Sequence, residues 1–152
     1  LAFSCALNDR VEAIHIYDSQ TQKVKKLIEP ILNDYSPTFD PTGQYLYFGS
    51  VRDFHPTYGE THFSLGFPKA AGIYVALLSE KTRNPFENPI TPPPQEKKNG
   101  KKDTKKPEVK TQIDFEGIDN RIHRAPIELG GHWKLFAVKN GFVYAQSGPR
   151  MY

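Results

Sequence analysis

The amino-acid sequence predicts an all-β fold. A turn signal, Asp-Pro-Thr-Gly at residues 40–43, separates two short apolar runs, and Asn140-Gly141 separates two more near the end of the chain. Proline pre-sets φ at the second turn position, glycine accepts a positive φ, and Asn-Gly is typical of two-residue hairpin turns. Short apolar runs bounded by turn residues are typical of strands. The chain should therefore fold as a series of β-hairpins.

The N-terminal part of the chain predicts three strands joined by polar turns. These strands are residues 1–7, 11–18 and 23–27. The last of them should lie at a sheet edge, because its lysines would discourage pairing with another chain. Residues 28–35 then cross to the next group of strands. Cys5 is expected to be a small buried side chain without a partner for an internal disulfide.

The stretch from Ser36 to Ser50 carries the strongest hairpin signal. Its second run, Tyr45–Phe48, is aromatic or large at every position and predicts a strand that is covered on both faces. The next connection, residues 51–71, is long, because ordinary hairpin loops have about two to five residues. We expect the third strand at residues 72–79 and the fourth at residues 109–115.

The C-terminal part of the chain predicts the start of a further group of strands. Arg121–Glu128 should begin it, followed by residues 133–139 and 142–146 on either side of the Asn-Gly turn. Trp133 and Phe136 are expected to be buried between sheets rather than to bind a ligand.

The net charge of +3 comes from one segment. Seven lysines and three acidic residues between Gln95 and Lys110 give 7 − 3 = +4, so the rest of the chain sums to −1. This segment follows three prolines and lacks aromatic residues for base stacking, which predicts a solvated, disordered insertion. Attachment to an anionic surface is the alternative. No apolar run approaches the roughly 18 residues of a membrane-spanning helix. We therefore expect no nucleic-acid partner and no membrane span.

Few side chains suggest catalysis or metal binding. Asp53, His55, Glu60 and His62 form the one local cluster of histidines and carboxylates, but they lack a recognised ligand spacing. We expect them to be ordinary loop residues, with no metal and no cofactor. The serines lie in neither a G-x-S-x-G elbow nor an S-x-x-K motif, and a serine without an adjacent base is a weak nucleophile. The sequence therefore predicts no catalytic residue.

The motifs resemble a known family in their order along the chain. The pattern S-P-x-F-D-P-x-G-x-x-L-Y-F-x-S of residues 36–50 resembles the first two strands of a blade in WD40-like (PD40) β-propellers, such as TolB and the tricorn proteases. Further matches resemble the second propeller of tricorn-type serine peptidases: residues 50–58, 67–70, 72–77, 84–86, 113–122, 125–127 and Gly130. The resemblance implies an incomplete β-propeller of about three four-stranded blades or part-blades.

The implied blades divide the chain into three parts. Residues 1–35 would be a partial blade, residues 36–120 a full blade, and residues 121–152 the start of the next blade. The full blade would contain the disordered Lys/Pro-rich insertion at about residues 88–110. Because the chain opens inside an apparent strand without an initiator methionine, we expect it to be a piece of a longer protein.

The resemblance also implies a function without catalysis in this chain. In tricorn-type peptidases the catalytic residues lie downstream of this propeller, and the propellers form funnels that guide or gate peptides to or from a proteolytic chamber. Arg121 and Arg124 are candidate channel residues for peptide carboxylates, because they precede the expected innermost strand of the last blade. Surface or inter-blade salt bridges are their alternative role.

The expected partners follow from the same resemblance. They are peptides or protein segments, the remaining blades and catalytic domains of the parent chain, and further copies of the parent in a homo-oligomer. The second function class is a TolB-like PD40 module that binds protein partners and belongs to no enzyme. The long connection at residues 51–71 and the segment 113–122 favour the peptidase. Cytoplasm and periplasm both remain open as compartments.

Overall fold

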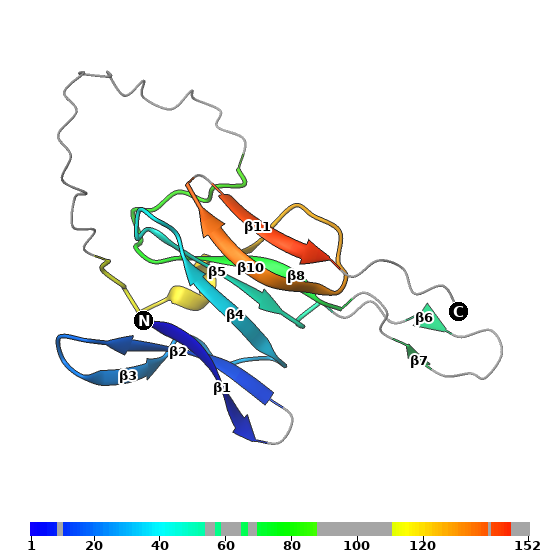
Figure 1. Ribbon diagram of the computed structural model, residues 1–152, viewed down its shortest axis with the longest axis horizontal. Helices are drawn as coiled ribbons and strands as arrows, with labels where there is room; N and C mark the ends of the chain where they lie inside the picture. Colours follow the sequence, from blue (N-terminus) through cyan, green and yellow to red (C-terminus); the bar gives the residue numbers. More distant parts are fainter. Residues whose placement is uncertain are drawn as a thin grey trace, which may run out of the picture.

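The structure is a computed structural model that describes residues 1–8, 11–53, 57–58, 65–66, 70–87, 111–139 and 141–146. These residues form antiparallel sheets and one 3-10 turn (Figure 1). The all-β prediction is therefore confirmed. No helix within these ranges is long and apolar enough to cross a membrane.

The first sheet has the strand order β1-β2-β3, with β1 at Ala2–Asn8, β2 at Val11–Asp18 and β3 at Lys23–Lys26. All three strands were predicted, and the lysine-bearing β3 lies at an edge as expected. The prediction for Cys5 is wrong, because this free cysteine is exposed on β1. Its small apolar character indicated burial, but β1 is also an edge strand and nothing in the described part of the chain covers it there.

The central sheet has the order β4-β5-β8-β9, and its strands are Asp34–Phe39, Tyr45–Ser50, Gly72–Leu77 and Ile122–Arg124. Gly43 adopts a φ of 72° in the turn between β4 and β5, as predicted. Every residue of β5 after Tyr45 and every residue of β8 is buried. The prediction that β5 is covered on both faces is thus confirmed.

The predicted fourth strand at residues 109–115 is wrong. Residues 111–115 contain no strand, and residues 109 and 110 lie outside the described part of the chain. The apolar side chains of Ile113 and Phe115 pack on the core, but the backbone joins β8 through the Asp114 N–H, which donates to the Leu78 carbonyl at 2.8 Å. The chain then turns at residues 118–121 (η1) and supplies β9 from beyond residue 120. The division into blades at that residue remains a prediction.

The last hairpin pairs β10 (His132–Val138) with β11 (Gly141–Gln146). The predicted hairpin is confirmed, with strand bounds that differ by one residue. β10 ends at Val138, which pairs with Gly141, so Gly141 is the first residue of β11 rather than part of the turn. Residue 140 itself lies outside the described ranges, as do the lysine-rich residues 88–110.

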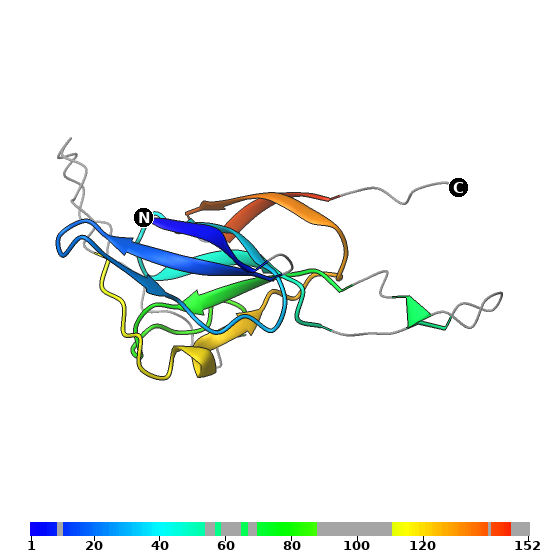
Figure 2. The ribbon, with the colours of Figure 1, turned by 90° about the horizontal axis from the view of Figure 1, so that it is seen from below.

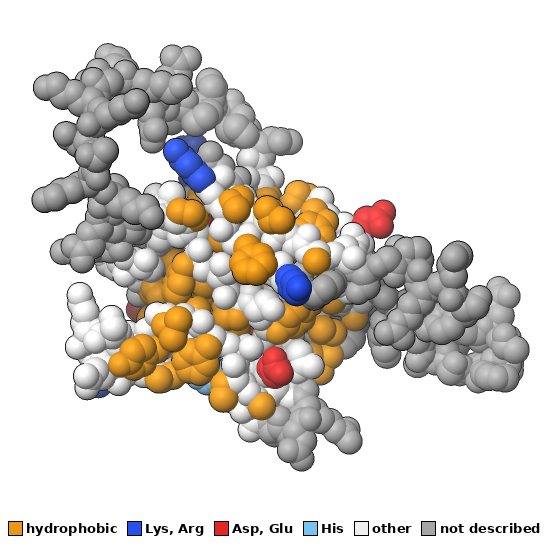
Figure 3. All heavy atoms as spheres, viewed as in Figure 1, with side chains coloured by type: hydrophobic (Ala, Val, Ile, Leu, Met, Phe, Trp, Pro, Cys, Tyr) orange, Lys and Arg blue, Asp and Glu red, His pale blue; other side chains and the backbone are white. Residues whose placement is uncertain are grey.

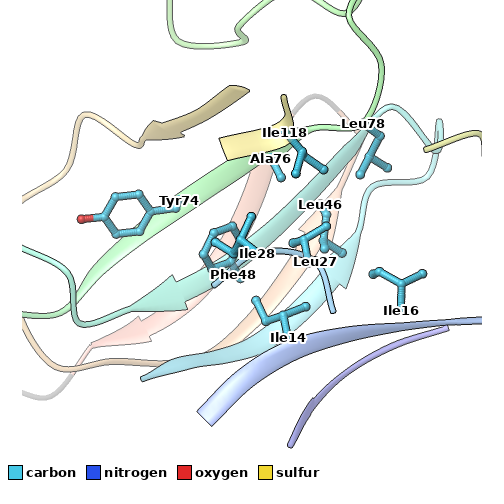
Figure 4. Packing of buried hydrophobic residues seen from close by; sticks show 10 residues of the cluster. All are labelled: Ile14, Ile16, Leu27, Ile28, Leu46, Phe48, Tyr74, Ala76, Leu78 and Ile118. Carbon is cyan, nitrogen blue, oxygen red and sulfur yellow. The ribbon is translucent and has the colours of Figure 1, made fainter. Parts of the chain in front are cut away.

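The central sheet separates two apolar cores. Leu46 and Phe48 of β5 face Ile14 and Ile16 of β2 in the first core, which Figure 4 shows together with Tyr74, Ala76 and Leu78. On the other face, side chains of β5 and β8 pack against the β10–β11 hairpin. The members of this second core are Tyr47, Ile73, Val75, Leu77, Ala125 and Leu135. The three sheets therefore form a stack in which both faces of the central sheet are covered by a neighbouring sheet.

Neighbouring sheets approach one another mainly through their first strands. β4 contacts β1 and β2 on one side and β10 on the other, whereas the outer strands β3 and β9 make their main contacts within their own sheets. The sheets thus converge at β1, β4 and β10 and diverge outward, as the blades of a propeller do around its axis. A small hairpin of β6 (Thr57–Tyr58) and β7 (Leu65–Gly66) lies beyond one end of the central sheet (Figure 2).

Candidate functional site

A cluster of charged and aromatic side chains lies where the long connection leaves β5. We call it the Arg52 cluster. It joins the starts of β4 and β8 to the ends of β5 and β9, and its members are Asp34, Ser50, Arg52, Asp53, Tyr74 and Arg124. Because β4, β5 and β8 alternate in direction, this end of the sheet is opposite the end that leads into the lysine-rich segment.

Arg52 and Asp34 form the buried half of the cluster. One guanidinium nitrogen, Nη2, donates to both carboxylate oxygens of Asp34, at 2.9 and 3.0 Å, and Nε donates to the Ser50 hydroxyl at 2.7 Å. The Asp34 side chain is fully buried, and that of Arg52 is 14% exposed. The guanidinium carbon also lies 4.9 Å from the centre of the Tyr74 ring, within the range of cation–π attraction. This pair anchors the first residues of the long connection to β4.

Asp53 forms the more exposed half of the cluster. Its Oδ2 accepts hydrogen bonds from the Tyr74 hydroxyl at 2.7 Å and from Nη1 of Arg124 at 2.9 Å. Burial, followed by the hydrogen bond to Asp53 and the charge of that carboxylate, raises the pKa of Tyr74 well above its ordinary value. The tyrosine therefore stays protonated and remains a donor. Residues 52 and 53 are in this way tied to β4, β8 and β9 at once.

The structure does not bring the two predicted channel arginines together. The Arg121 side chain is 13% exposed, and its guanidinium donates to the backbone carbonyls of Leu77 (3.3 Å), Glu116 (2.9 Å) and Asp114. Arg121 thereby fastens the turn before β9 to the end of β8. Arg124, by contrast, is 46% exposed beside Asp53. Both salt bridges and carbonyl contacts fit the alternative, structural role.

The two arginines lie at either end of β9: Arg121 precedes it and Arg124 is its last residue. This strand is the edge of the central sheet farthest from β4 and pairs with β8, so the expectation that residues 121–128 belong with the C-terminal hairpin is wrong. Along the chain both arginines precede β10, the strand of the last hairpin that contacts β4. Whether either arginine contacts a peptide remains a prediction.

The structure locates only some of the other residues singled out in the sequence. Of the predicted His/carboxylate loop residues, Asp53 belongs to the Arg52 cluster, whereas His55, Glu60 and His62 lie outside the described ranges. Among the residues that the structure describes, no group of three or more His, Cys, Asp or Glu side chains could hold a metal ion. Phe136 is 61% exposed, so its predicted burial is wrong for these three sheets, and the side chain of Trp133 is not described.

Sequence reasoning missed the Arg52–Asp34 pair. The two residues are 18 positions apart, Asp34 as the first residue of β4 and Arg52 just after β5, so no local pattern links them. A usable signal was present, because Arg52 and Asp53 follow directly on the buried run of β5. Charged residues at the end of a buried strand need partners, and such partners come from neighbouring strands.

A sequence model described as the tricorn protease second beta propeller domain matches residues 1–151. The chain belongs to this family. The match spans all the described elements, so the ordered motifs from residue 36 to Gly130 reflect membership of the family.

Proteins similar in sequence to this chain agree with the family assignment. The chain is 30% identical over 127 residues to a putative tricorn-like protease C-terminal subunit of Sulfurisphaera tokodaii and to a tricorn protease homolog of Saccharolobus solfataricus. Each match covers 84% of this chain, but 13% and 11% of the relatives. It is 34% identical over 116 residues, 73% of its length, to tricorn protease homolog 1 of Streptomyces coelicolor, of which it covers 10%. The chain thus spans about a tenth of the relatives it matches.

A solved structure has the same fold as this chain. The crystal structure of the tricorn protease superposes on 90% of this chain with a TM-score of 0.65, at 18% sequence identity and over 12% of that protein. The likeness confirms the predicted fold class, an incomplete β-propeller of part-blades. The sheets of three, four and two strands are consistent with that class.

Proposed function

We propose that this chain is the second-propeller part of a tricorn-like serine peptidase and that it guides or gates peptides on their way to or from a proteolytic chamber. The observation that carries the proposal is the family match over residues 1–151. The relatives are named as proteases or their homologs, and this chain corresponds to about a tenth of their length. The peptide-cleaving residues would lie elsewhere in the parent protein.

The shape of the sheet stack supports a guiding role. Sheets that converge at their first strands leave a passage along the common axis once a ring of such sheets is complete. The convergence of β1, β4 and β10 therefore suggests where this passage would run. A peptide on its way along the axis would meet these strands first.

Arg124 is the better of the two arginines for a contact with a peptide carboxylate. A guanidinium has five N–H donors, and that of Arg124 is 46% exposed and donates to Asp53 through Nη1. Arg121 already donates to three backbone carbonyls. Because β9 is the outer strand, a contact at Arg124 would hold a peptide outside the axial passage, before entry or after exit.

The full-length parent provides the test of the proposed function. We would measure the hydrolysis of fluorogenic peptides of graded length by the parent and by the parent lacking residues 1–152, with a serine-reactive probe as a check that the catalytic part is intact. We expect the parent to cleave, and the truncated form to change its length selectivity or product release while still taking up the probe. A parent that neither cleaves nor takes up the probe would refute the peptidase assignment and favour a partner-binding propeller.

The proposed carboxylate contact predicts a specific effect of Arg124→Gln in the parent. Loss of one charge-assisted contact should lower kcat/KM about 3- to 30-fold for peptides with a free C-terminal carboxylate and leave their amidated forms unchanged. Arg83→Gln is the matched control, because Arg83 is exposed in the connection after β8, at the other end of the sheet. Equal effects on free and amidated peptides would show that Arg124 has a structural role only.

A further inference from the structure

The first strands of the three stacked sheets, β1, β4 and β10, each carry a β-bulge. In the pairing of β4 with β5, two residues, Ser36 and Pro37, lie opposite one, Phe48. In β1, Leu7 is an extra residue in the pairing with β2. The other pairs that the structure describes, β2–β3, β5–β8, β6–β7 and β8–β9, keep an unbroken register. The bulges are thus confined to the strands at which the sheets converge.

The bulge in β10 repeats that in β4. Lys134 and Leu135 of β10 lie together opposite Tyr144 of β11. Lys134 has a φ of 50°, and Ser36, at the corresponding position of β4, has a φ of 51°. Such left-handed backbone is costly for residues other than glycine and persists only where the surroundings impose it. Its recurrence in two successive sheets indicates a feature of the architecture rather than an accident of one strand.

The inner and outer edges of the sheets are protected in different ways. The outer strand β3 carries three lysines in four residues, and the outer strand β9 has only three residues. The inner strands β1 and β4 carry no exposed charged side chain, because the buried Asp34 is paired with Arg52, and the inner strand β10 carries a single exposed lysine, Lys134, which lies within its bulge. Instead they carry bulges, and β4 also carries Pro37, which has no backbone N–H. Bulges and proline interrupt the row of backbone groups to which an additional strand would pair.

We propose that the inner edges of β1, β4 and β10 are built to let an extended peptide pass without pairing to them as an additional strand. The inference rests on the proposed peptide-guiding function. An unfolded peptide is a ready partner for an open sheet edge, since main-chain hydrogen bonds are independent of side chains. An inner edge with regular pairing groups would retain such peptides, and a lysine-rich edge would retain acidic ones. An edge with an interrupted backbone avoids both kinds of retention. In β4 the interrupting residue is Pro37, which lacks the N–H donor.

The test measures peptide release from the full-length parent carrying Pro37→Val, which restores a backbone N–H in the bulge. The serine is first blocked with a serine-reactive probe, so that binding is measured without cleavage. The ligand is a fluorescent 12-residue peptide of alternating valine and threonine. The control ligand is the same peptide N-methylated at alternate residues. One restored hydrogen bond should slow release of the first peptide about three- to ten-fold and leave the second unchanged.

Two further variants keep the test decisive. Pro126→Val changes an exposed proline after β9 and should leave the release of both peptides at the parent rate. Ser36→Gly relieves the left-handed backbone without restoring a donor, so it should raise the free energy of unfolding and leave release unchanged. Release of the unmethylated peptide at the parent rate from Pro37→Val, or equal slowing of both peptides, would overturn the proposal. Failure of the peptidase assignment would show itself separately, as a wild-type parent that does not cleave peptides.

Discussion

Gly49 shows how one residue sets the approach of two sheets. A Cβ built on Gly49 would lie 2.4 Å from the ring of Tyr35, so the ring rests directly on the glycine backbone. The Tyr35 hydroxyl then donates to the His132 carbonyl at 3.1 Å, which links β4 to the first residue of β10. The absence of a side chain at position 49 is therefore a condition for the contact between the second and third sheets.

We predict that Gly49→Ala lowers the free energy of unfolding of the chain by about 1–3 kcal/mol, because the new methyl group overpacks the Tyr35 ring. Urea unfolding measures the change. The double variant Gly49→Ala, Tyr35→Leu should recover part of the loss, since the smaller side chain makes room. If the two changes instead add independently, the ring of Tyr35 is not what constrains Gly49.

Tyr47 makes the stability of the folded chain depend on pH in the alkaline range. Burial, followed by the charges of Asp40 and Tyr45, raises its pKa from 10.0 to about 12. A tyrosine whose folded pKa lies above its unfolded value contributes stability that is complete below pH 10 and is lost as the pH rises towards 12. We expect wild type to lose on the order of 2 kcal/mol relative to Tyr47→Phe between pH 9 and pH 12. Parallel pH profiles of the two proteins would contradict this.

At the scale of elements, the Arg52–Asp34 pair holds the start of the long connection. Removal of one partner leaves the other as a buried charge, so Asp34→Ala should lower the free energy of unfolding by about 3–5 kcal/mol. Adding Arg52→Met to Asp34→Ala should recover much of that loss, because no buried charge then remains. A double variant as unstable as the sum of the single variants would show that the pair is not coupled. Denaturant unfolding of all four proteins measures the coupling.

The elements that could be predicted from the sequence are those with local chemistry. The β4–β5 hairpin was found because Asp40 and Gly43 carry the turn: Oδ1 of Asp40 accepts the N–H groups of Gln44 and Tyr45 at 2.9 and 2.8 Å, and Gly43 takes the positive φ. A strand was expected at residues 121–128, but it was grouped with the C-terminal hairpin and not with β8, because β9 has three residues and no turn of its own. Its pairing with β8 spans the lysine-rich segment, so only tertiary structure defines it.

The candidate site was predictable only as a family property. The resemblance included residues 50–58 without a role for Arg52, because the partner Asp34 lies on another strand and no short motif joins them. The bulge at Ser36 was likewise missed. The Ser-Pro pair was interpreted as the start of a hairpin, whereas the strand begins two residues earlier, at Asp34, and the pair interrupts it.

At the scale of the whole molecule, apolar side chains remain exposed on the outer faces of the stack. Phe136 and Val143 lie opposite each other on β10 and β11 and are 61% and 58% exposed, and Val138 is 41% exposed beside them. Figure 3 shows hydrophobic side chains gathered on the face that carries β10 and β11, and also over β1. Apolar sheet faces of this kind are interaction surfaces.

We expect the isolated chain to associate through this face. Sedimentation velocity should show oligomers whose proportion rises with protein concentration, and Phe136→Ser with Val143→Thr should shift the chain towards monomer. Val24→Thr is the control, because Val24 is 52% exposed on the outer edge strand β3, apart from that face. A sharp, concentration-independent monomeric melt of the unmodified chain would count against an open propeller.

Photo-crosslinking in the full-length parent tests the central claim most directly, that peptides pass along the inner strands of this propeller segment. A benzoylphenylalanine at position 5, exposed on the inner strand β1, is compared with one at position 24, exposed on the outer strand β3. During turnover of a fluorescent peptide, we predict crosslinks from position 5 and few from position 24. Crosslinks from position 24 alone, or from neither position while the parent cleaves the peptide, would contradict the account.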